Sequence, residues 1–273
     1  MAPGSPVALD SAPVKAVILC GGQGTRIRDA NESLPKPMLP IGGKPIVWHI
    51  MKMYARHGVR DFVLCLGYKG WAIKEFFLNY KAMTSDLTVT LGRHGAVEVL
   101  GHHDEEDWKV TLAETGEETM TGGRVAAVRR YVEGDEPFLL TYGDGVSDVD
   151  ISATIAAHRK HGKVATVTAV RPPGRFGEMV IDGGHVREFN EKPQVTEGFI
   201  NGGFFVLDGR RTWDFVGQNP QTIFEREPLR GLARQDQLVA YPHTGFWQPM
   251  DTLREYQLLN ELWAAGKAPW KTW

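Results

Sequence analysis

The chain has 273 residues, of which 42% are hydrophobic and 23% are charged, and its formal net charge is −2. These values are typical of a globular chain and exclude a general attraction to nucleic acid or to an anionic membrane. Because residues 1–14 lack a signal peptide's pattern and no apolar run approaches the roughly 18 residues of a membrane span, we expect a disordered tail, then one cytoplasmic domain over residues 15–273.

The first organising stretch follows an apolar run, AVILC, that predicts a strand buried on both faces of a parallel sheet. Gly21, Gly22 and Gly24 come directly after it, and glycines at a strand end let backbone N–H groups approach a phosphate. The spacing fits neither GxGxxG nor GxxxxGK[ST], so a plain β-to-α turn remains open. Arg26, and Lys36 between two prolines, favour a polyphosphate cradle instead.

The next residues predict alternating helices and strands. Apolar residues at helical spacing predict a helix from residue 46 to Gly58, and DFVLCLGY predicts a second strand parallel to the first. WAIKEFFLNY reads as another helix, and LTVTL and WKVTLAET read as strands on either side of a polar excursion. The His102, His103 and Asp104 run in that excursion lacks zinc spacing, which indicates a solvated loop. Cys20 and Cys65 lie in apolar runs and predict buried thiols in a reducing compartment.

Residues 119–124, TMTGGR, then open a helical pattern, VAAVRRYV, and an ordinary helix cap is the simplest interpretation. The second organising stretch is PFLLTYGDGVSDVD, an apolar strand that ends in Gly143-Asp144-Gly145. Ligands of open α/β sheets bind beyond the carboxyl ends of strands, so Asp144 is a candidate magnesium ligand, although an Asp in a turn is the alternative. Asp148 and Asp150 are typical of residues that begin the helix that follows.

The remaining pattern predicts strands at 163–170, an antiparallel pair within 171–193, a strand over 199–207, and a helix plus short strand over 223–243. Asn201 has an amide suited to hydroxyl recognition. Asp251 precedes the last helix, where by position it is an ordinary N-cap. We expect Leu229 and Leu232 in the core, and we expect the inward side of the last helix to carry Leu253, Tyr256, Leu259 and Trp263.

The glycine stretch, GG-x-G-T-R followed by a K-P lysine, resembles the signature of the sugar-1-phosphate nucleotidyltransferases. Two segments, KPMLPIGGKPIVWHIMKMYARHG and the final GKAPWKTW, are similar to one branch of that family, the glucose-1-phosphate cytidylyltransferases. The resemblance covers residues 15–273. It implies an α/β fold with a Rossmann-like mixed, mostly parallel sheet flanked by helices, with small β-rich excursions.

The resemblance also implies the site. The nucleotide is expected to contact Leu19, Gly21, Gly22, Gly24, Thr25, Arg26, Lys36, Thr119, Gly123, Arg124 and Gly143. The sugar phosphate is expected to contact Glu191, Lys192, Asn201 and Gly202, and Mg²⁺ to bind Asp144 and Asp251. Arg26, Lys36 and Asp144 are then the catalytic residues.

The implied reaction transfers a cytidylyl group from CTP to α-D-glucose 1-phosphate and releases pyrophosphate, making CDP-glucose for deoxysugar and polysaccharide biosynthesis, such as that of the lipopolysaccharide O-antigen. Cys20, Gln23 and the segment GEMVID depart from the residues that are usual in the branch, but these changes are conservative or lie away from the expected contacts. A uridylyl- or thymidylyltransferase is the alternative within the enzyme class. A catalytically silent regulatory relative is disfavoured because every expected charged residue is present, and a Rossmann dehydrogenase because GxGxxG is missing.

The branch further implies a homo-oligomer, with a hexamer as one candidate, and no nucleic acid or membrane partner. Four aromatics near the C-terminus are equally compatible with an interface between subunits and with packing of the last helix and tail onto the core: Trp247, Trp263, Trp270 and Trp273.

Overall fold

The computed structural model describes residues 14–24, 33–92, 95–101, 105, 107–134, 136–172, 178–182, 185–190 and 198–273. The expected tail, except its last residue, lies outside this part of the chain. Val14 is buried in the core, so the packed chain begins at least one residue before the expected boundary. None of the described helices is long and apolar enough to cross a membrane.

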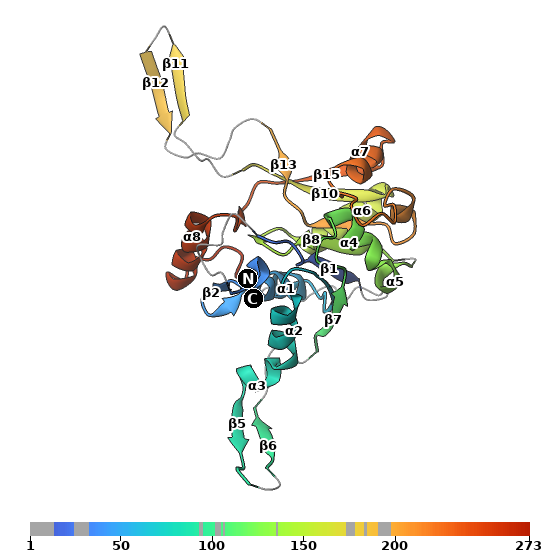
Figure 1. The fold of residues 1–273 in the computed structure, drawn as a ribbon. Coiled ribbons are helices and arrows are strands. Elements are labelled where there is room, and N and C mark those ends of the chain that lie inside the picture. The colour runs from blue at the N-terminus through green and yellow to red at the C-terminus, as the bar shows by residue number, and fades with distance from the viewer. Residues whose placement is uncertain are drawn as a thin grey trace, which may run out of the picture.

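The centre of the fold is an eight-stranded sheet with the order β13-β10-β14-β8-β1-β4-β7, in which β15 also pairs with β10 (Figure 1). Strand β1 pairs in parallel with both β4 and β8, whereas β14 runs antiparallel to β8 and to β10. The predicted mixed, mostly parallel sheet is therefore confirmed. The strands are β1 (Lys15–Leu19), β4 (Asp61–Leu66), β7 (Lys109–Glu114), β8 (Phe138–Tyr142), β10 (Ala165–Val170), β13 (Ile200–Asn201), β14 (Phe205–Leu207) and β15 (Leu238–His243).

Both faces of the sheet are covered, which explains the unbroken apolar run of β1. Ala16 and Ile18 pack into one core cluster, while Val17 and Leu19 pack into the other, because successive side chains of a strand point to opposite faces. Helices α1 (Ile46–Arg56), α2 (Gly70–Leu78), α3 (Tyr80–Thr84), α6 (Ile151–His161) and α8 (Leu253–Ala264) contribute to the first cluster. Helices α4 (Thr121–Ala127), α5 (Arg129–Val132) and α7 (Glu227–Arg234), with the short 3-10 turn η3 (Arg211–Asp214), contribute to the second.

Four two-stranded ribbons form the β-rich excursions. They are β2 (Pro40–Ile41) with β3 (Lys44–Pro45), β5 (Asp86–Val89) with β6 (Val97–Leu100), β9 (Gly145–Ser147) with β16 (Trp247–Pro249), and β11 (Glu178–Asp182) with β12 (His185–Asn190). The β5–β6 ribbon projects away from the body of the molecule (Figure 1). The antiparallel pair expected within 171–193 is confirmed as β11–β12. His102, His103 and Asp104 lie outside the described residues.

Two expectations about strands and helices are wrong in part. The strand expected over 199–207 is broken between β13 and β14, where Gly203 and Phe204 have φ of +77° and +47°. On the expected inward side of α8, Leu259 is fully buried, whereas Leu253 is 39% exposed and does not face the core. Leu229 and Leu232 are buried as expected.

The C-terminal aromatics pack onto their own chain. Trp270 is fully buried, and Trp247, Trp263 and Trp273 pack against the same core cluster. The Trp270 ring stacks on Phe246 with centroids 5.6 Å apart. Of the two alternatives for these residues, packing of the last helix and tail is therefore the one that the fold supports.

Candidate active site

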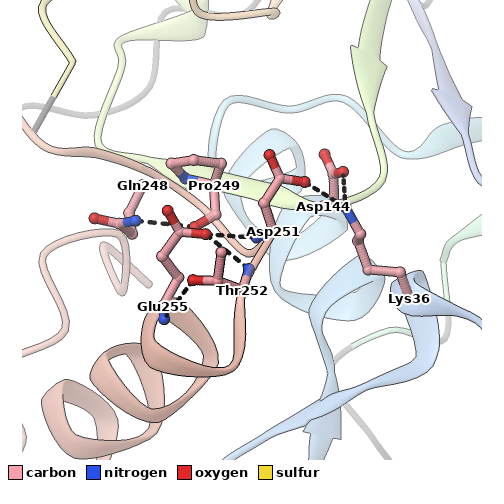
Figure 2. Close-up of polar contacts among 7 residues, drawn as sticks. All are labelled: Lys36, Asp144, Gln248, Pro249, Asp251, Thr252 and Glu255. Carbon is pink, nitrogen blue, oxygen red and sulfur yellow. Dashed lines mark hydrogen bonds and ion pairs between the residues drawn. The ribbon is translucent and has the colours of Figure 1, made fainter. Parts of the chain in front are cut away.

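A lysine joins two carboxylates at the carboxyl edge of the sheet (Figure 2). The ammonium of Lys36 donates to Oδ2 of Asp144 at 2.9 Å and to Oδ1 of Asp251 at 2.5 Å. The Lys36 side chain is only 10% exposed, while those of Asp144 and Asp251 are 32% and 22% exposed. One cation is therefore held between two partly exposed carboxylates that belong to distant parts of the chain.

Local structure explains why these three residues meet. Asp144 follows β8, and the β9–β16 ribbon pairs Gly145 with Pro249, which places Asp144 beside the segment that leads to Asp251. The backbone N–H of Met250 donates to the Asp144 carbonyl at 2.8 Å. Lys36 begins a one-turn 3-10 helix, η2 (Lys36–Met38), between Pro35 and Pro37, which stiffen the backbone that carries it.

The N-cap of α8 is not Asp251, so that part of the prediction is wrong. Thr252 is the N-cap, and with Glu255 it forms a capping box in which each side chain binds the other's backbone N–H. The carboxylate of Glu255 also accepts the N–H of Asp251 at 2.7 Å (Figure 2). The helix end is thus capped by these two residues, and the Asp251 carboxylate binds Lys36.

The electrostatics keep this lysine charged. Burial acts to lower the pKa of Lys36, but the charges of Asp144 and Asp251 and their hydrogen bonds outweigh burial, so its pKa lies above the ordinary value. Two partly exposed carboxylates, neutralised here by an ammonium, are also the donor set that Mg²⁺ prefers when phosphates and water complete its coordination. The residues thus fit a divalent cation.

A cavity of about 250 Å³ lies beside this cluster, beyond the ends of β1 and β8. Its lining residues are Leu19, Cys20, Gly21, Gly22, Gly24, Lys36, Pro37, Thr119, Met120, Thr121, Arg124, Tyr142, Gly143 and Asp144. The structure therefore brings together most of the residues predicted for the nucleotide. Thr25, Arg26, Glu191 and Lys192 lie outside the described residues.

Glycines make this cavity possible by letting backbone segments approach closely. A Cβ on Gly21 would lie 2.2 Å from Nη1 of Arg124, and one on Gly143 would lie 2.8 Å from the Leu19 carbonyl oxygen. Gly24 has φ of +58° and rests against the Lys36 side chain. Gly22 differs, since a Cβ there would meet nothing within 4 Å among the described atoms. Gly22 therefore leaves open space at the cavity wall.

Arg124 organises the wall rather than projecting a free charge. Its guanidinium donates to the carbonyls of Leu66, Gly116, Gly21 and Glu117 and to the hydroxyl of Thr115, at 2.7–3.1 Å. These acceptors come from the ends of two strands and from the glycine loop. Burial lowers the pKa of Arg124 from its ordinary value, although a guanidinium remains charged at neutral pH.

Gly123 is turned away from the cavity. A Cβ there would lie 2.4 Å from the carbonyl oxygen of Pro220, and the N–H groups of Gly122 and Gly123 both donate to the Thr222 carbonyl. The glycines of TMTGGR thus allow the 220–225 segment to dock on the start of α4. The N-cap position of α4 is Met120, whose side chain makes no capping hydrogen bond.

Cys20 lines the cavity floor, but it is a poor nucleophile. The thiol is completely buried, and burial raises its pKa well above the ordinary value, with the charges of Cys65 and Asp144 adding to the effect. Cys20 and Cys65 are both free and buried thiols, as predicted. The cavity therefore offers charge and close backbone approach, not covalent catalysis.

The predicted sugar side is built on tightly packed backbone. Asn201 ends β13, and its Oδ1 accepts the N–H of Gly203 at 2.9 Å. A Cβ on Gly202 would lie 2.7 Å from a Val170 methyl group, and the Gly202 carbonyl accepts the indole N–H of Trp247 at 2.8 Å. Asn201 and Gly202 are consequently fixed against β10 and β16.

Three polar residues of this region were missed by sequence reasoning. Tyr142 and Thr121 line the cavity, and both hydroxyls donate to the carboxylate of Glu225, at 2.6 Å each. Tyr142 could have been found from its place directly before Gly143 at a strand end. Glu225 carries no such signal, because only the docking of the 220–225 segment on α4 brings it to the cavity.

Comparison with known proteins identifies the family of the chain. The nucleotidyl transferase family model matches residues 15–248. The chain is 55% identical over 261 residues to a glucose-1-phosphate cytidylyltransferase of Salmonella typhi, covering 95% of this chain and all of that protein. It is 30% identical to a mannose-1-phosphate guanylyltransferase catalytic subunit beta of Drosophila pseudoobscura pseudoobscura, covering 92% of this chain and 63% of that one.

Solved structures share the fold at much lower identity. The chain superposes on a UTP-bound UGPase from Acinetobacter baumannii with a TM-score of 0.65 and 16% identity, covering 93% of this chain and 94% of that one. It superposes on HddC from Yersinia pseudotuberculosis with a TM-score of 0.63 and 22% identity, over 92% and 99% of the two chains. At these identities the likeness describes the fold alone.

Proposed function

The chain belongs to the nucleotidyl transferase family and is a nucleotidyltransferase, and from that premise we propose that it transfers a cytidylyl group from CTP to α-D-glucose 1-phosphate. The products are CDP-glucose and pyrophosphate. The 55% identity to a glucose-1-phosphate cytidylyltransferase over that protein's full length supports the choice of both substrates. The single structural observation that supports the chemistry best is the Lys36–Asp144–Asp251 cluster at the mouth of the glycine-walled cavity.

The proposed reaction needs little proton transfer. A sugar phosphate has a second pKa near ~6 and is mostly dianionic at neutral pH, so its oxygen is already a nucleophile. The enzyme's task is to hold two anions together and to stabilise the charge that develops as the α-phosphorus is attacked in line. A site built from fixed cations and backbone donors suits that task.

The roles proposed for the chain's residues follow from this task. The backbone of the Gly21–Gly24 loop cradles the phosphates, and the Lys36 ammonium, which contacts both carboxylates, binds the α-phosphate region. Arg26 stabilises the leaving pyrophosphate and Lys192 holds the incoming phosphate. Asn201, with Glu191, takes the sugar hydroxyls. The roles of Arg26, Glu191 and Lys192 rest on the sequence resemblance, because these residues lie outside the described part of the chain.

Asp144 and Asp251 are the residues proposed to hold a divalent cation, with Mg²⁺ as the specific choice. When bound, Mg²⁺ would neutralise charge on the phosphate oxygens as the reaction proceeds. Both carboxylates are partly exposed and contact the same ammonium, so they lie where one cation can be shared. Lys36 would then exchange part of its contact with the carboxylates for contact with phosphate.

The direct test is pyrophosphate release from glucose 1-phosphate and Mg²⁺, with CTP, UTP, dTTP, ATP and GTP in separate reactions. The proposal expects release with CTP well above the others. Release with UTP or dTTP instead would keep the reaction class and reject the base. Release with none of them, followed by failure of a panel of other sugar 1-phosphates, would reject the function.

Self-association is part of the proposal as well. The β5–β6 ribbon projects from the body of the molecule (Figure 1). It and its connecting loop expose apolar side chains, among them Val89 at 53%, Leu91 at 91% and Val97 at 63% exposure. Apolar surface of this kind on a projecting arm favours a contact with another copy of the chain. Light scattering on the purified protein tests it, and a monomer at micromolar concentration would reject it.

A further inference from the structure

The carboxylate of Glu225 reaches the active site through a segment that docks on the start of α4. The N–H of Met120 donates to the Pro220 carbonyl at 2.8 Å, and the N–H groups of Gly122 and Gly123 donate to the Thr222 carbonyl at 2.9 and 3.1 Å. Because the two glycines have no Cβ, the backbones touch directly. This docking fixes Glu225 within reach of two cavity-lining hydroxyls.

A chain of four side chains then crosses the site. The hydroxyl of Thr121 donates to Oε2 of Glu225, and the hydroxyl of Tyr142 donates to Oε1, both at 2.6 Å. The amide Nδ2 of Asn201 donates to the Tyr142 hydroxyl at 3.0 Å. Thr121 and Tyr142 line the cavity predicted for the nucleotide, and Asn201 belongs to the predicted sugar side, so the chain spans both halves of the site.

The hydrogen-bond donors and acceptors around Glu225 explain why a carboxylate occupies the middle of this chain of side chains. The Tyr142 hydroxyl already accepts from Asn201, and the Thr121 hydroxyl already accepts the N–H of Phe224 at 2.9 Å. Each hydroxyl therefore directs its own proton toward Glu225, which must accept twice. An ionised carboxylate has only acceptors and can do so, whereas a glutamine amide offers one oxygen and an NH₂ group that would oppose a second donor.

The orientation of the Asn201 amide follows from the same chain. Its Oδ1 is held by the N–H of Gly203 and one Nδ2 hydrogen by Tyr142. Among the described contacts, this leaves the second Nδ2 hydrogen and one lone pair of Oδ1 for a hydroxyl of a ligand. Burial raises the pKa of Tyr142, and the Glu225 charge raises it further, so the phenol keeps the proton that it donates.

We propose that Glu225 is a positioning residue of the transfer reaction, which orients the Asn201 amide for the sugar through Tyr142 and fixes Thr121 at the nucleotide end. The inference rests on the proposed function, because it assigns Asn201 to the sugar. Glu225 need not touch either substrate. Loss of Glu225 should therefore weaken binding of the sugar phosphate by disordering Asn201. Substitutions at Glu225 and at Asn201 should then not have independent effects.

The test compares the Michaelis constants of the full-length protein for glucose 1-phosphate and for CTP in wild type, Glu225→Gln, Asn201→Ala and the double variant. Glu227→Gln is the matched control, since that glutamate lies two residues away with a side chain 74% exposed. We expect Glu225→Gln to raise KM for glucose 1-phosphate by about tenfold or more, as for the loss of a charge-assisted hydrogen bond. We expect the double variant to be no worse than Asn201→Ala.

The inference would be overturned by a Glu225→Gln protein whose KM for glucose 1-phosphate matches that of the control, or by effects that multiply in the double variant. If Glu225→Gln does not fold, Tyr142→Phe interrupts the same link with the ring retained, and an unchanged sugar KM there also overturns it. A wild type that prefers UTP or dTTP rejects the base choice alone, and the comparison is run with that nucleotide. A wild type active with no substrate pair overturns both proposals.

Discussion

The ammonium of Lys36 lies 2.5 Å from Oδ1 of Asp251, although 215 residues separate them in the chain. The same nitrogen is 2.9 Å from Asp144, so one lysine connects the start of the fold to both candidate metal ligands. Each carboxylate is more exposed than the lysine between them. The cluster can therefore receive a cation from solvent without unfolding.

Replacing Lys36 by Ala should slow turnover strongly. A charge-assisted contact of this kind contributes about 1.5–3 kcal/mol, which corresponds to roughly ten- to hundredfold in rate. Initial rates at saturating substrates measure it. Lys109→Ala is the control, because that side chain is 73% exposed and lies at the opposite end of its strand from the site. Retained activity in Lys36→Ala would remove the catalytic assignment.

Replacing Asp251 by Asn should raise the Mg²⁺ concentration needed for half-maximal activity by about tenfold or more, since one charged ligand is lost. The capping box of α8 is made by Thr252 and Glu255, so the helix should remain intact. A magnesium titration of the rate measures this, with Asp236→Asn as control because that side chain is 90% exposed. An unchanged requirement for Mg²⁺ would show that Asp251 is no ligand.

Alanine at two neighbouring glycines should have different effects. Gly22→Ala should leave the midpoint of thermal unfolding unchanged, because its Cβ meets no described atom within 4 Å. It should nevertheless weaken the binding of CTP, because the new methyl group fills space through which the phosphates approach the backbone. Gly21→Ala should lower the midpoint as well, since its Cβ would lie 2.2 Å from Arg124. Differential scanning fluorimetry and the KM for CTP separate the two effects. Normal CTP binding by Gly22→Ala would argue against a phosphate cradle at that residue.

Stability should fall on acidification partly through His49. This histidine is fully buried, and burial lowers its pKa from 6.5 to about 4. Between these values the unfolded state binds a proton that the folded state does not, so the free energy of unfolding decreases as the pH falls from 6.5 toward 4, by about 3 kcal/mol in total. Above pH 6.5 the effect vanishes.

Urea unfolding of wild type and His49→Gln at pH 7.5 and pH 5.0 measures this contribution. The neutral ring donates from Nε2 to the Ile41 carbonyl at 2.8 Å, and its Nδ1 accepts the Trp270 indole N–H at 3.4 Å. His49→Gln should be less stable at pH 7.5 but lose less on acidification. His185→Asn, at an exposed position, should follow wild type. Equal losses in all three proteins would contradict the assignment to His49.

Sequence reasoning succeeded where local pattern decides the structure. The apolar runs of β1 and β8, the glycines that follow each of them and the helical spacing of α1 each specify one element, so the sequence predicts Lys36 in a phosphate cradle and Asp144 at a strand's carboxyl end. Asp251 came from resemblance, because by position alone it was expected to cap α8. Thr252 performs that role together with Glu255.

The remaining differences arise from contacts between distant segments. The bond from Tyr142 to Glu225 spans 83 residues, and no spacing rule brings 220–225 onto α4. Arg124, which was expected to contact the nucleotide, lines the cavity, and its guanidinium also binds backbone carbonyls from three separate segments, which no spacing rule predicts. Leu253 has the period of a core residue but lies at the solvent side of the first turn of α8.

Transfer of a cytidylyl group to glucose 1-phosphate is best tested by a competition experiment. Equal concentrations of CTP, UTP, dTTP, ATP and GTP are incubated in one tube with the protein, glucose 1-phosphate and Mg²⁺, and the nucleotide sugars are identified by mass. Because all nucleotides compete for one site, product ratios report relative kcat/KM. We expect CDP-glucose as the dominant product, with pyrophosphate in an amount equal to the total nucleotide sugar. Dominance of UDP-glucose or dTDP-glucose, or the absence of any nucleotide sugar, would contradict it.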